Sequence, residues 1–222
     1  MKKKLKIGIL DDDSSKVTQI MSTLMYGMIG ASPEKKDKYD DFEFEPYEIK
    51  VQQDIQHMID EVIEQELDCV LVDYNLSSYE VAGFTGVEFA KHLEDVLYDF
   101  PIFILTSYED DLFANEIYNA YQVFNFERYL SEPLERVELN FKIIEQIQKS
   151  VKQKEQWEQE IYKLLPLAGT SEEIDSRLIE LDTKLEKSIN GKYSLPKKIK
   201  KDLGTNKLNE LLEKIDRILD KE

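Results

Sequence analysis

The stretch "LKIGILDDD", residues 5–13, joins a short apolar run to three consecutive aspartates. A run of this length, rich in aliphatic side chains, favours a buried strand. Residues 14–28 follow with apolar side chains at helical spacing, so we expect a helix there, capped by Ser14 or Ser15. A buried strand that passes directly into a helix is typical of a β–α unit.

The same alternation of apolar runs and helical patterns continues to about residue 148. Residues 30–41 are polar and indicate a loop, and Pro46 predicts an edge position for the second strand. Strands separated by helices predict the α/β class: a doubly wound, five-stranded parallel sheet of order 2-1-3-4-5, followed by a helical extension. We expect further strands at 42–51, 68–74, 101–107 and 128–130, and helices at 54–66, 86–99, 111–121 and from 134 onward.

The C-terminal third carries only helical patterns. The last helix of the sheet region keeps its apolar stripe to Val151 and is ended by Pro166 and Gly169. Two more narrow stripes, at 174–189 and 208–219, are typical of a helical hairpin or a coiled-coil seam. We therefore expect a first domain at 1–148 and a helical extension at 149–222.

Charge and composition limit the classes of function. Of the net charge of −17, all lies in residues 1–149, which hold 14 basic and 31 acidic residues, while residues 150–222 hold 15 of each. This balance argues against DNA binding. The single cysteine, Cys69, excludes a disulfide framework and favours a reducing compartment. No apolar stretch has the length of a signal peptide or a membrane span, so we expect a cytoplasmic protein without membrane contact.

Carboxylates follow two strands that the expected topology makes neighbours. Asp11 and Asp12 end the first strand and Asp73 ends the third, so their side chains should share one crevice. Packed carboxylates repel unless a cation intervenes, and all-oxygen ligands suit Mg²⁺. Asp73 could then attack a phosphorus centre, with the hydroxyl of Thr106, at the end of the fourth strand, near the same crevice.

Ordered motifs in residues 4–148 resemble a receiver domain, the phosphoacceptor module of bacterial two-component signalling. The motifs are "ILDDD" at 9–13, "DCVLVDYNL" at 68–76, "GVEF" at 86–89, "PIFILTS" at 101–107 and "YLSEP" at 129–133. The resemblance implies a response-regulator protein of a phosphorelay, not an enzyme, that receives its phosphoryl group from a histidine kinase or phosphotransfer protein. A downstream protein would bind the helical extension, which could also form a homodimer.

The resemblance also implies a role for each residue that matches a motif. Asp11 and Asp12 resemble the acid pair that binds Mg²⁺, and Asp73 resembles the phosphoacceptor. Asn75 would give its backbone carbonyl to the same metal. Thr106 matches the switch hydroxyl and Tyr129 the switch aromatic of the family, whose movements turn phosphorylation into a change of surface.

Glu132 departs from the family pattern, which has a lysine before this proline. A further carboxylate in the crevice would cost on the order of 3 kcal/mol for each like-charge pair at about 5 Å. Arg128, four residues earlier, is not expected to replace the lysine. Two hypotheses follow: a phosphorylatable receiver with altered switching, or a degenerate receiver that acts as a phosphorylation-independent scaffold.

A third hypothesis comes from the first motif. "ILDDDSS" and "IFILTS" also resemble a haloacid-dehalogenase-type phosphatase, in which Asp11 would be the nucleophile and Asp13 the acid/base. That family needs a lysine that Glu132 does not supply, and it leaves Asp73 without a role.

Overall fold

The structure is a computed structural model that describes residues 2–76, 83–107 and 122–201. The helix expected at 111–121 and the apolar stripe at 208–219 lie outside the described residues. The chain forms two compact units. Unit 1 comprises Met1–Asp95 and Asp99–Ser150, and unit 2 comprises Val96–Tyr98 and Val151–Glu222.

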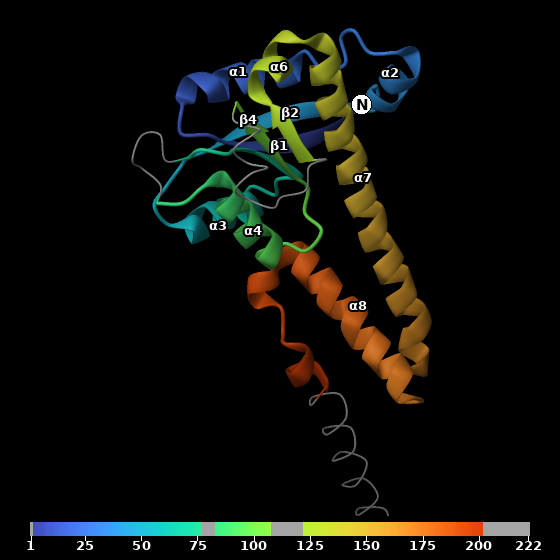
Figure 1. The fold of residues 1–222 in the computed structure, drawn as a ribbon. Coiled ribbons are helices and arrows are strands. Elements are labelled where there is room, and N and C mark those ends of the chain that lie inside the picture. The colour runs from blue at the N-terminus through green and yellow to red at the C-terminus, as the bar shows by residue number, and fades with distance from the viewer. Residues whose placement is uncertain (1, 77–82, 108–121, 202–222) are drawn as a thin grey trace, which may run out of the picture. The chain divides into compact units, whose positions relative to one another are not determined.

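Unit 1 is built on a five-stranded, all-parallel sheet (Figure 1). The strand order is β2-β1-β3-β4-β5, which confirms the expected doubly wound, flavodoxin-like topology. Pro46 lies in β2 at the edge of the sheet, where a residue without an amide hydrogen is tolerated. The strands are β1 Lys3–Leu10, β2 Phe42–Ile49, β3 Cys69–Asp73, β4 Ile102–Thr106 and β5 Val123–Asn125.

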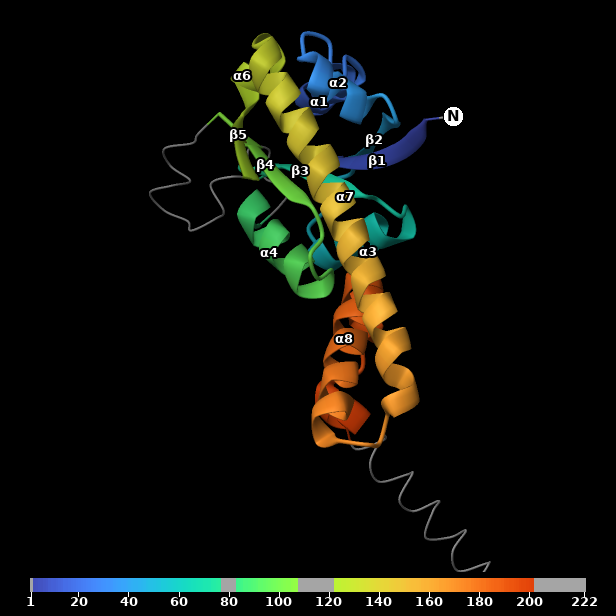
Figure 2. The ribbon, with the colours of Figure 1, turned by 90° about the vertical axis from the view of Figure 1, so that its right-hand side faces the viewer.

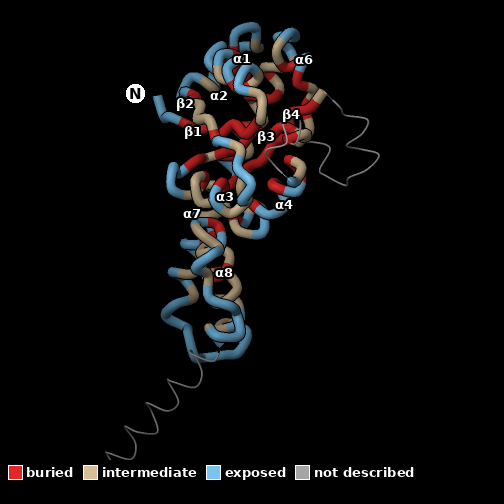
Figure 3. Tube along the Cα trace, turned by 90° about the vertical axis from the view of Figure 1, so that its left-hand side faces the viewer, coloured by how far each residue is buried: buried red, intermediate tan, exposed pale blue. Residues whose placement is uncertain are grey.

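Helices cover both faces of this sheet. The helix α1 (Ser14–Met25) and the first part of α7 (Pro133–Leu164) lie on one face, while α3 (Ile55–Glu64) and α4 (Gly86–Val96) lie on the other (Figures 1 and 2). The strands β1, β3 and β4 in the middle of the sheet hold its most deeply buried segments, whereas the edge strand β2 is largely exposed or half-buried (Figure 3). Every residue of β3 and β4 is buried, as the continuous apolar runs of central parallel strands require.

The junction between β1 and α1 differs from the sequence prediction in its cap. Asp13, rather than Ser14 or Ser15, is the N-cap, and its Oδ1 accepts a hydrogen bond from the Ser15 amide at 2.8 Å. Aspartate is among the best N-cap residues for two reasons. Its carboxylate accepts a hydrogen bond from a backbone amide that has no partner in the helix, and its negative charge is attracted to the positive end of the helix dipole. Asp13 therefore has a structural task at the start of α1.

The polar segment 30–41 is not only a loop, as the sequence analysis expected. It contains the helix α2 (Pro33–Tyr39), whose N-cap Ser32 accepts a hydrogen bond from the Lys35 amide. Serine followed by proline at the first helical position is a recognised start signal, which the high charge of the segment obscured. The Lys35 ammonium pairs with Glu138 of α7 at 2.7 Å.

The segment between Thr106 and α7 contains the main error of the sequence prediction. The fifth strand is Val123–Asn125, and residues 128–130, which were expected to form it, belong to the helix α6 (Phe126–Ser131). Asn125 caps this helix by accepting a hydrogen bond from the Arg128 amide at 3.0 Å. Glu132 is thus the C-cap of a helix and not the residue that follows a strand.

Unit 2 contains the second half of α7, the helix α8 (Glu172–Asn190) and the 3₁₀ turns Leu165–Leu167 and Gly191–Tyr193. Arg177 of α8 forms a two-pronged ion pair with Glu160 of α7, at 2.7 and 3.0 Å. Trp157 is buried and its ring lies 5.7 Å from that of Tyr98. In the part of the chain that the structure describes, no helix is both long and apolar enough to cross a membrane.

Candidate functional site

The carboxylates of Asp11, Asp12 and Asp73 meet at the carboxyl end of the sheet. Each offers one oxygen, and these oxygens all lie within 4.8 Å of one another. Strands β1 and β3 bring them together, because Leu10 and Val72 are register partners and the chain leaves both strands at the same edge. The structure therefore assembles the three aspartates that the sequence predicts to converge, at the switch point where sheets of this kind bind ligands.

Burial makes this cluster electrostatically costly. Asp11 is only 6% exposed, and burial, reinforced by the charge of Asp73, raises its pKa to about 7. Burial also raises the pKa of Asp73, although the Lys16 ammonium opposes the shift. Both carboxyls consequently hold protons more tightly than ordinary aspartates, and a bound cation would relieve the same repulsion.

The Oδ2 oxygen of Asp73 is the least satisfied atom of the crevice among the described residues. Asp73 is 7% exposed, and among the described residues no donor lies within hydrogen-bond distance of its Oδ2. Buried carboxylate oxygens normally have partners, so this atom is suited to a ligand. Three carboxylates with one unsatisfied oxygen fit a hard divalent cation such as Mg²⁺, whose ligands are oxygens.

Lys16, in the first turn of α1, is the cation that the structure places at this cluster. Its Nζ lies 3.6 Å from Asp73 Oδ2 and 4.0 Å from Asp11 Oδ2. Burial lowers the pKa of Lys16, but the attraction of Asp73 and the other three aspartates outweighs it and the net pKa is raised. The lysine therefore stays protonated and partly balances the carboxylates.

A glycine at the start of α4 lies directly against the backbone of Asp73. A Cβ atom at Gly86 would lie 1.9 Å from the backbone oxygen of Asp73, so only glycine fits this close approach. Thr85 and Glu88 hold the helix start in place, because the Glu88 carboxylate accepts from the Thr85 amide and the Thr85 hydroxyl accepts from the Glu88 amide. The motif "GVEF" thus fixes a helix against the strand that carries Asp73.

Two other predicted site residues lie beside Asp73. The backbone amide of Asn75 donates a hydrogen bond to the Asp73 carboxylate, which keeps the chain after β3 turned toward the crevice. Thr106 is fully buried at the end of β4, one position beyond Leu105, the register partner of Asp73. Thr106 in turn has Asn125 of β5 as its register partner.

Tyr129 has a different setting from the one its expected position on a strand implied. It lies on α6, is fully buried, and donates its hydroxyl hydrogen to Asn140 Oδ1 of α7 at 3.2 Å. The Asn140 amide group continues this chain by donating to the Gly27 oxygen at 3.0 Å. The Tyr129 hydroxyl thus helps to join α6, α7 and the turn after α1.

Glu132 does not add its charge to the aspartates. Its side chain is 52% exposed, and its carboxylate accepts from Arg128 Nε at 3.3 Å. Arg128 also pairs with Glu135 at 3.0 Å, so it serves the α6–α7 junction. The negative charge of Glu132, where the resemblance led us to expect a lysine, is therefore paired with Arg128 on the surface.

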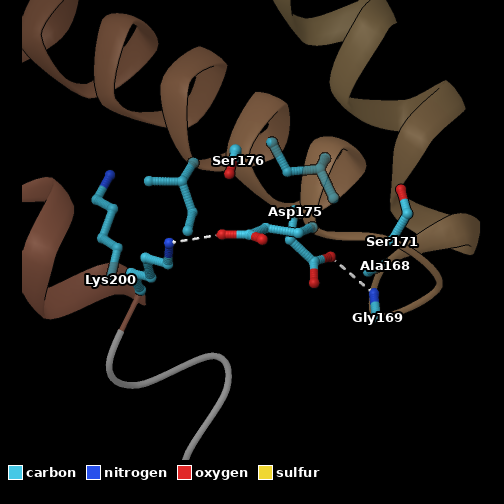
Figure 4. A pocket seen from close by; sticks show the side chains of 10 residues that line it. Ala168, Gly169, Ser171, Asp175, Ser176 and Lys200 are labelled. Carbon is cyan, nitrogen blue, oxygen red and sulfur yellow. Dashed lines mark hydrogen bonds and ion pairs between the residues drawn. The ribbon is translucent and has the colours of Figure 1, made fainter.

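A pocket of about 600 Å³ lies within unit 2 (Figure 4). Asp175, which lines it, accepts a hydrogen bond from the Gly169 amide at 2.7 Å. Its two lysines are engaged in ion pairs, Lys200 with Asp182 and Glu186, and Lys201 with Glu172. The charged groups that line this pocket are therefore engaged in contacts that stabilise unit 2. Among the described residues, the cluster suited to chemistry is the group of aspartates in unit 1.

Sequence reasoning missed two residues of the crevice. Lys16 lies in the first turn of the helix that follows the aspartates. A positive charge so close to them in sequence was the signal that could have found it. Phe126, whose ring centroid is 5.4 Å from Lys16 Nζ, had no signal, because α6 was not expected.

Comparison with known proteins does not identify a family for this chain. No protein-family model matches the chain, and no curated protein matches it. Among solved structures, the chain is similar to a yeast Spc42 trimeric coiled coil fused to another structure, with 19% identity and a TM-score of 0.40. That similarity covers 64% of this chain and 83% of the other, and it is too remote to carry an argument. The site therefore stands on its own geometry.

Proposed function

We propose that this protein is an atypical response-regulator receiver that accepts a phosphoryl group on Asp73. One observation carries the proposal: Asp73 Oδ2 is buried without a hydrogen-bond partner among the described residues, inside a cluster of three carboxylates and a lysine. A carboxylate in such a setting can act as a nucleophile. The topology and the motifs at 9–13, 68–76, 86–89 and 101–107 add fold-level support, which is analogy.

The proposed reaction transfers a phosphoryl group from a histidine kinase, a phosphotransfer protein or a small acyl phosphate. An Asp73 carboxylate oxygen forms a bond to phosphorus while the bond from phosphorus to the donor atom breaks. The donor atom, a histidine nitrogen or an acyl oxygen, leaves with the electron pair, and the product is an acyl phosphate on Asp73.

The residues around Asp73 have separable roles in this proposal. Asp11, Asp12, Asp73 and the Asn75 carbonyl would hold Mg²⁺, which supplies charge neutralisation for the incoming oxygens. The Thr106 hydroxyl, at the end of β4, would donate a hydrogen bond to a phosphoryl oxygen. Phosphorylation would change the surface that unit 1 presents to partners. Unit 2 would serve as a protein-binding arm or homodimer contact, without direct DNA binding.

A phosphorylation-independent scaffold is the second candidate, and Lys16 is the observation that favours it. The ammonium already compensates Asp11 and Asp73, so the crevice is partly neutral without any ligand. The phosphatase hypothesis is weaker, because the carboxylate of Asp13 caps α1 instead of being held for proton transfer.

Calorimetric titration with beryllofluoride, a mimic of the phosphoryl group, separates the two leading candidates. In the presence of Mg²⁺ the wild type should bind with one-to-one stoichiometry, and Asp73→Asn should not bind. Absence of heat for the wild type, with the protein folded, would favour the scaffold. Asp54→Asn is a matched control, because Asp54 caps α3 outside the three-aspartate cluster and should leave binding unchanged.

A further inference from the structure

The proposed function counts Lys16 as part of the charge of the cluster but gives it no contact with the phosphoryl group. Its ammonium lies between two buried carboxylates, 3.6 Å from Asp73 Oδ2 and 4.0 Å from Asp11 Oδ2. Both distances exceed the 2.7–2.9 Å typical of charge-assisted hydrogen bonds. The lysine is thus close to Asp73 without being locked to it.

Two features hold the Lys16 side chain near the crevice. Asp13 caps α1 and its carbonyl accepts from the Val17 amide at 3.0 Å, which fixes the first turn and points Lys16 back toward the aspartates. Phe126, at the start of α6, lies with its ring centroid 5.4 Å from Nζ, a distance at which an ammonium is attracted to the ring face. The side chain remains 29% exposed, so it keeps room to move.

Neither Glu132 nor Arg128 supplies a positive charge to the crevice in this arrangement. They pair with each other at 3.3 Å on the exposed side of α6, and Arg128 also holds Glu135. Of the lysines in the described ranges, Lys16 is the one that the structure pairs with Asp11 and Asp73. A positive charge at the crevice therefore comes from the start of α1 and not from the segment before Pro133.

We infer that Lys16 is the residue that holds the phosphoryl group on Asp73, through an ion pair between its ammonium and a phosphoryl oxygen. This inference rests on the proposed function. Without a phosphoryl group, the Lys16 ammonium neutralises part of the charge of Asp73 and Asp11. When Asp73 is phosphorylated, the ammonium pairs with a phosphoryl oxygen instead. The same ammonium competes with a divalent cation for those carboxylates before phosphorylation, because both neutralise the same charges.

The test measures two bindings on the full-length chain and its variants. Beryllofluoride is titrated at saturating Mg²⁺, and Mg²⁺ alone is titrated separately. Lys16→Met removes the charge at similar length, Lys16→Arg keeps the charge, and Lys36→Met removes a lysine charge from the exposed side of α2 as a control. Thermal unfolding of each variant establishes that it is folded.

Lys16→Met should bind beryllofluoride at least about tenfold more weakly, as expected for loss of a hydrogen-bonded charge. It should bind Mg²⁺ about tenfold more tightly, because the competing ammonium is gone. Lys16→Arg should restore beryllofluoride affinity to within about threefold, and Lys36→Met should match the wild type. Weaker binding of both ligands by Lys16→Met would indicate a merely structural residue and overturn the inference.

The outcomes also separate this inference from the proposed function. A wild type that binds beryllofluoride, with Lys16→Met binding it equally well, would overturn the role of Lys16 and leave Asp73 as the acceptor. A wild type that binds no beryllofluoride would overturn the proposed function, and the role of Lys16 with it.

Discussion

Glu132 accepts an ion-paired hydrogen bond from Arg128, one helical turn earlier, at 3.3 Å between Nε and Oε1. The pair lies on the exposed side of α6, and the carboxylate is half exposed. Glu132, which the sequence resemblance placed at a lysine position of receiver domains, is therefore a surface residue at the end of a helix. The charge of the crevice is set elsewhere, by Asp11, Asp73 and Lys16.

Glu132→Lys should leave the crevice unchanged. We expect beryllofluoride affinity to stay within about twofold of the wild type and the free energy of unfolding within about 0.5 kcal/mol, because exposed ion pairs contribute little. Calorimetry and urea denaturation measure the two quantities. A large gain in beryllofluoride affinity would mean that position 132 does reach the crevice, contrary to the structure.

Gly86→Ala should destabilise unit 1. The added Cβ would lie 1.9 Å from the backbone oxygen of Asp73, so α4 or the end of β3 must shift, at a cost of about 2–4 kcal/mol. Gly83→Ala is the matched control, since no described atom lies within 4 Å of its Cβ position. Equal unfolding free energies for the two variants, measured in urea, would refute the close packing of α4 on Asp73.

Tyr129→Phe should destabilise the protein by about 1–2 kcal/mol. The change removes the donor to Asn140 Oδ1 and leaves a buried acceptor without its partner. Tyr26→Phe loses the hydroxyl of an exposed tyrosine and should change stability by less than about 0.5 kcal/mol. The comparison uses urea denaturation, and similar values for both variants would show that the Tyr129 bond contributes nothing.

Magnesium affinity should rise with pH across neutrality. The pKa of Asp11 is raised from its ordinary 3.8 to about 7, so at pH 6 the carboxyl is mostly protonated and must lose its proton to bind the cation. At pH 8 it is ionised, while Lys16, whose pKa is raised, stays charged throughout. Between pH 6 and pH 8 we expect a gain of about tenfold in affinity.

Calorimetry at the two pH values measures this gain, and Asp73, whose pKa burial also raises, is the other titrating carboxyl that contributes. Asp11→Asn should lose most of the pH dependence, because the titrating carboxyl is absent. An unchanged wild-type affinity between pH 6 and pH 8 would show that Asp11 is not a ligand or that its pKa is ordinary.

The central part of the fold follows from simple sequence patterns. The runs that became β1, β3 and β4 are short, aliphatic and followed by helical periodicity, so burial alone dictates their structure. The convergence of Asp11, Asp12 and Asp73 then follows from topology, because parallel strands end at a common edge.

The segment from Val123 to Glu132 could not be predicted in the same way. β5 has only three residues, and "RYL" has the aromatic and aliphatic character of a strand although Asn125 caps it as a helix. Lys16 was missed for a different reason. Its contact with Asp73 depends on the direction of a side chain at a helix start, which sequence spacing alone does not give.

Mass spectrometry of the protein after incubation with acetyl phosphate tests the central claim most directly. With Mg²⁺, the wild type should gain the mass of one phosphate, located on the peptide that contains Asp73, and acetate should be released. The gain should be absent with a chelator in place of Mg²⁺ and absent in Asp73→Asn. A folded wild type that gains no phosphate at saturating donor and Mg²⁺, or a gain that persists in Asp73→Asn, would contradict the account.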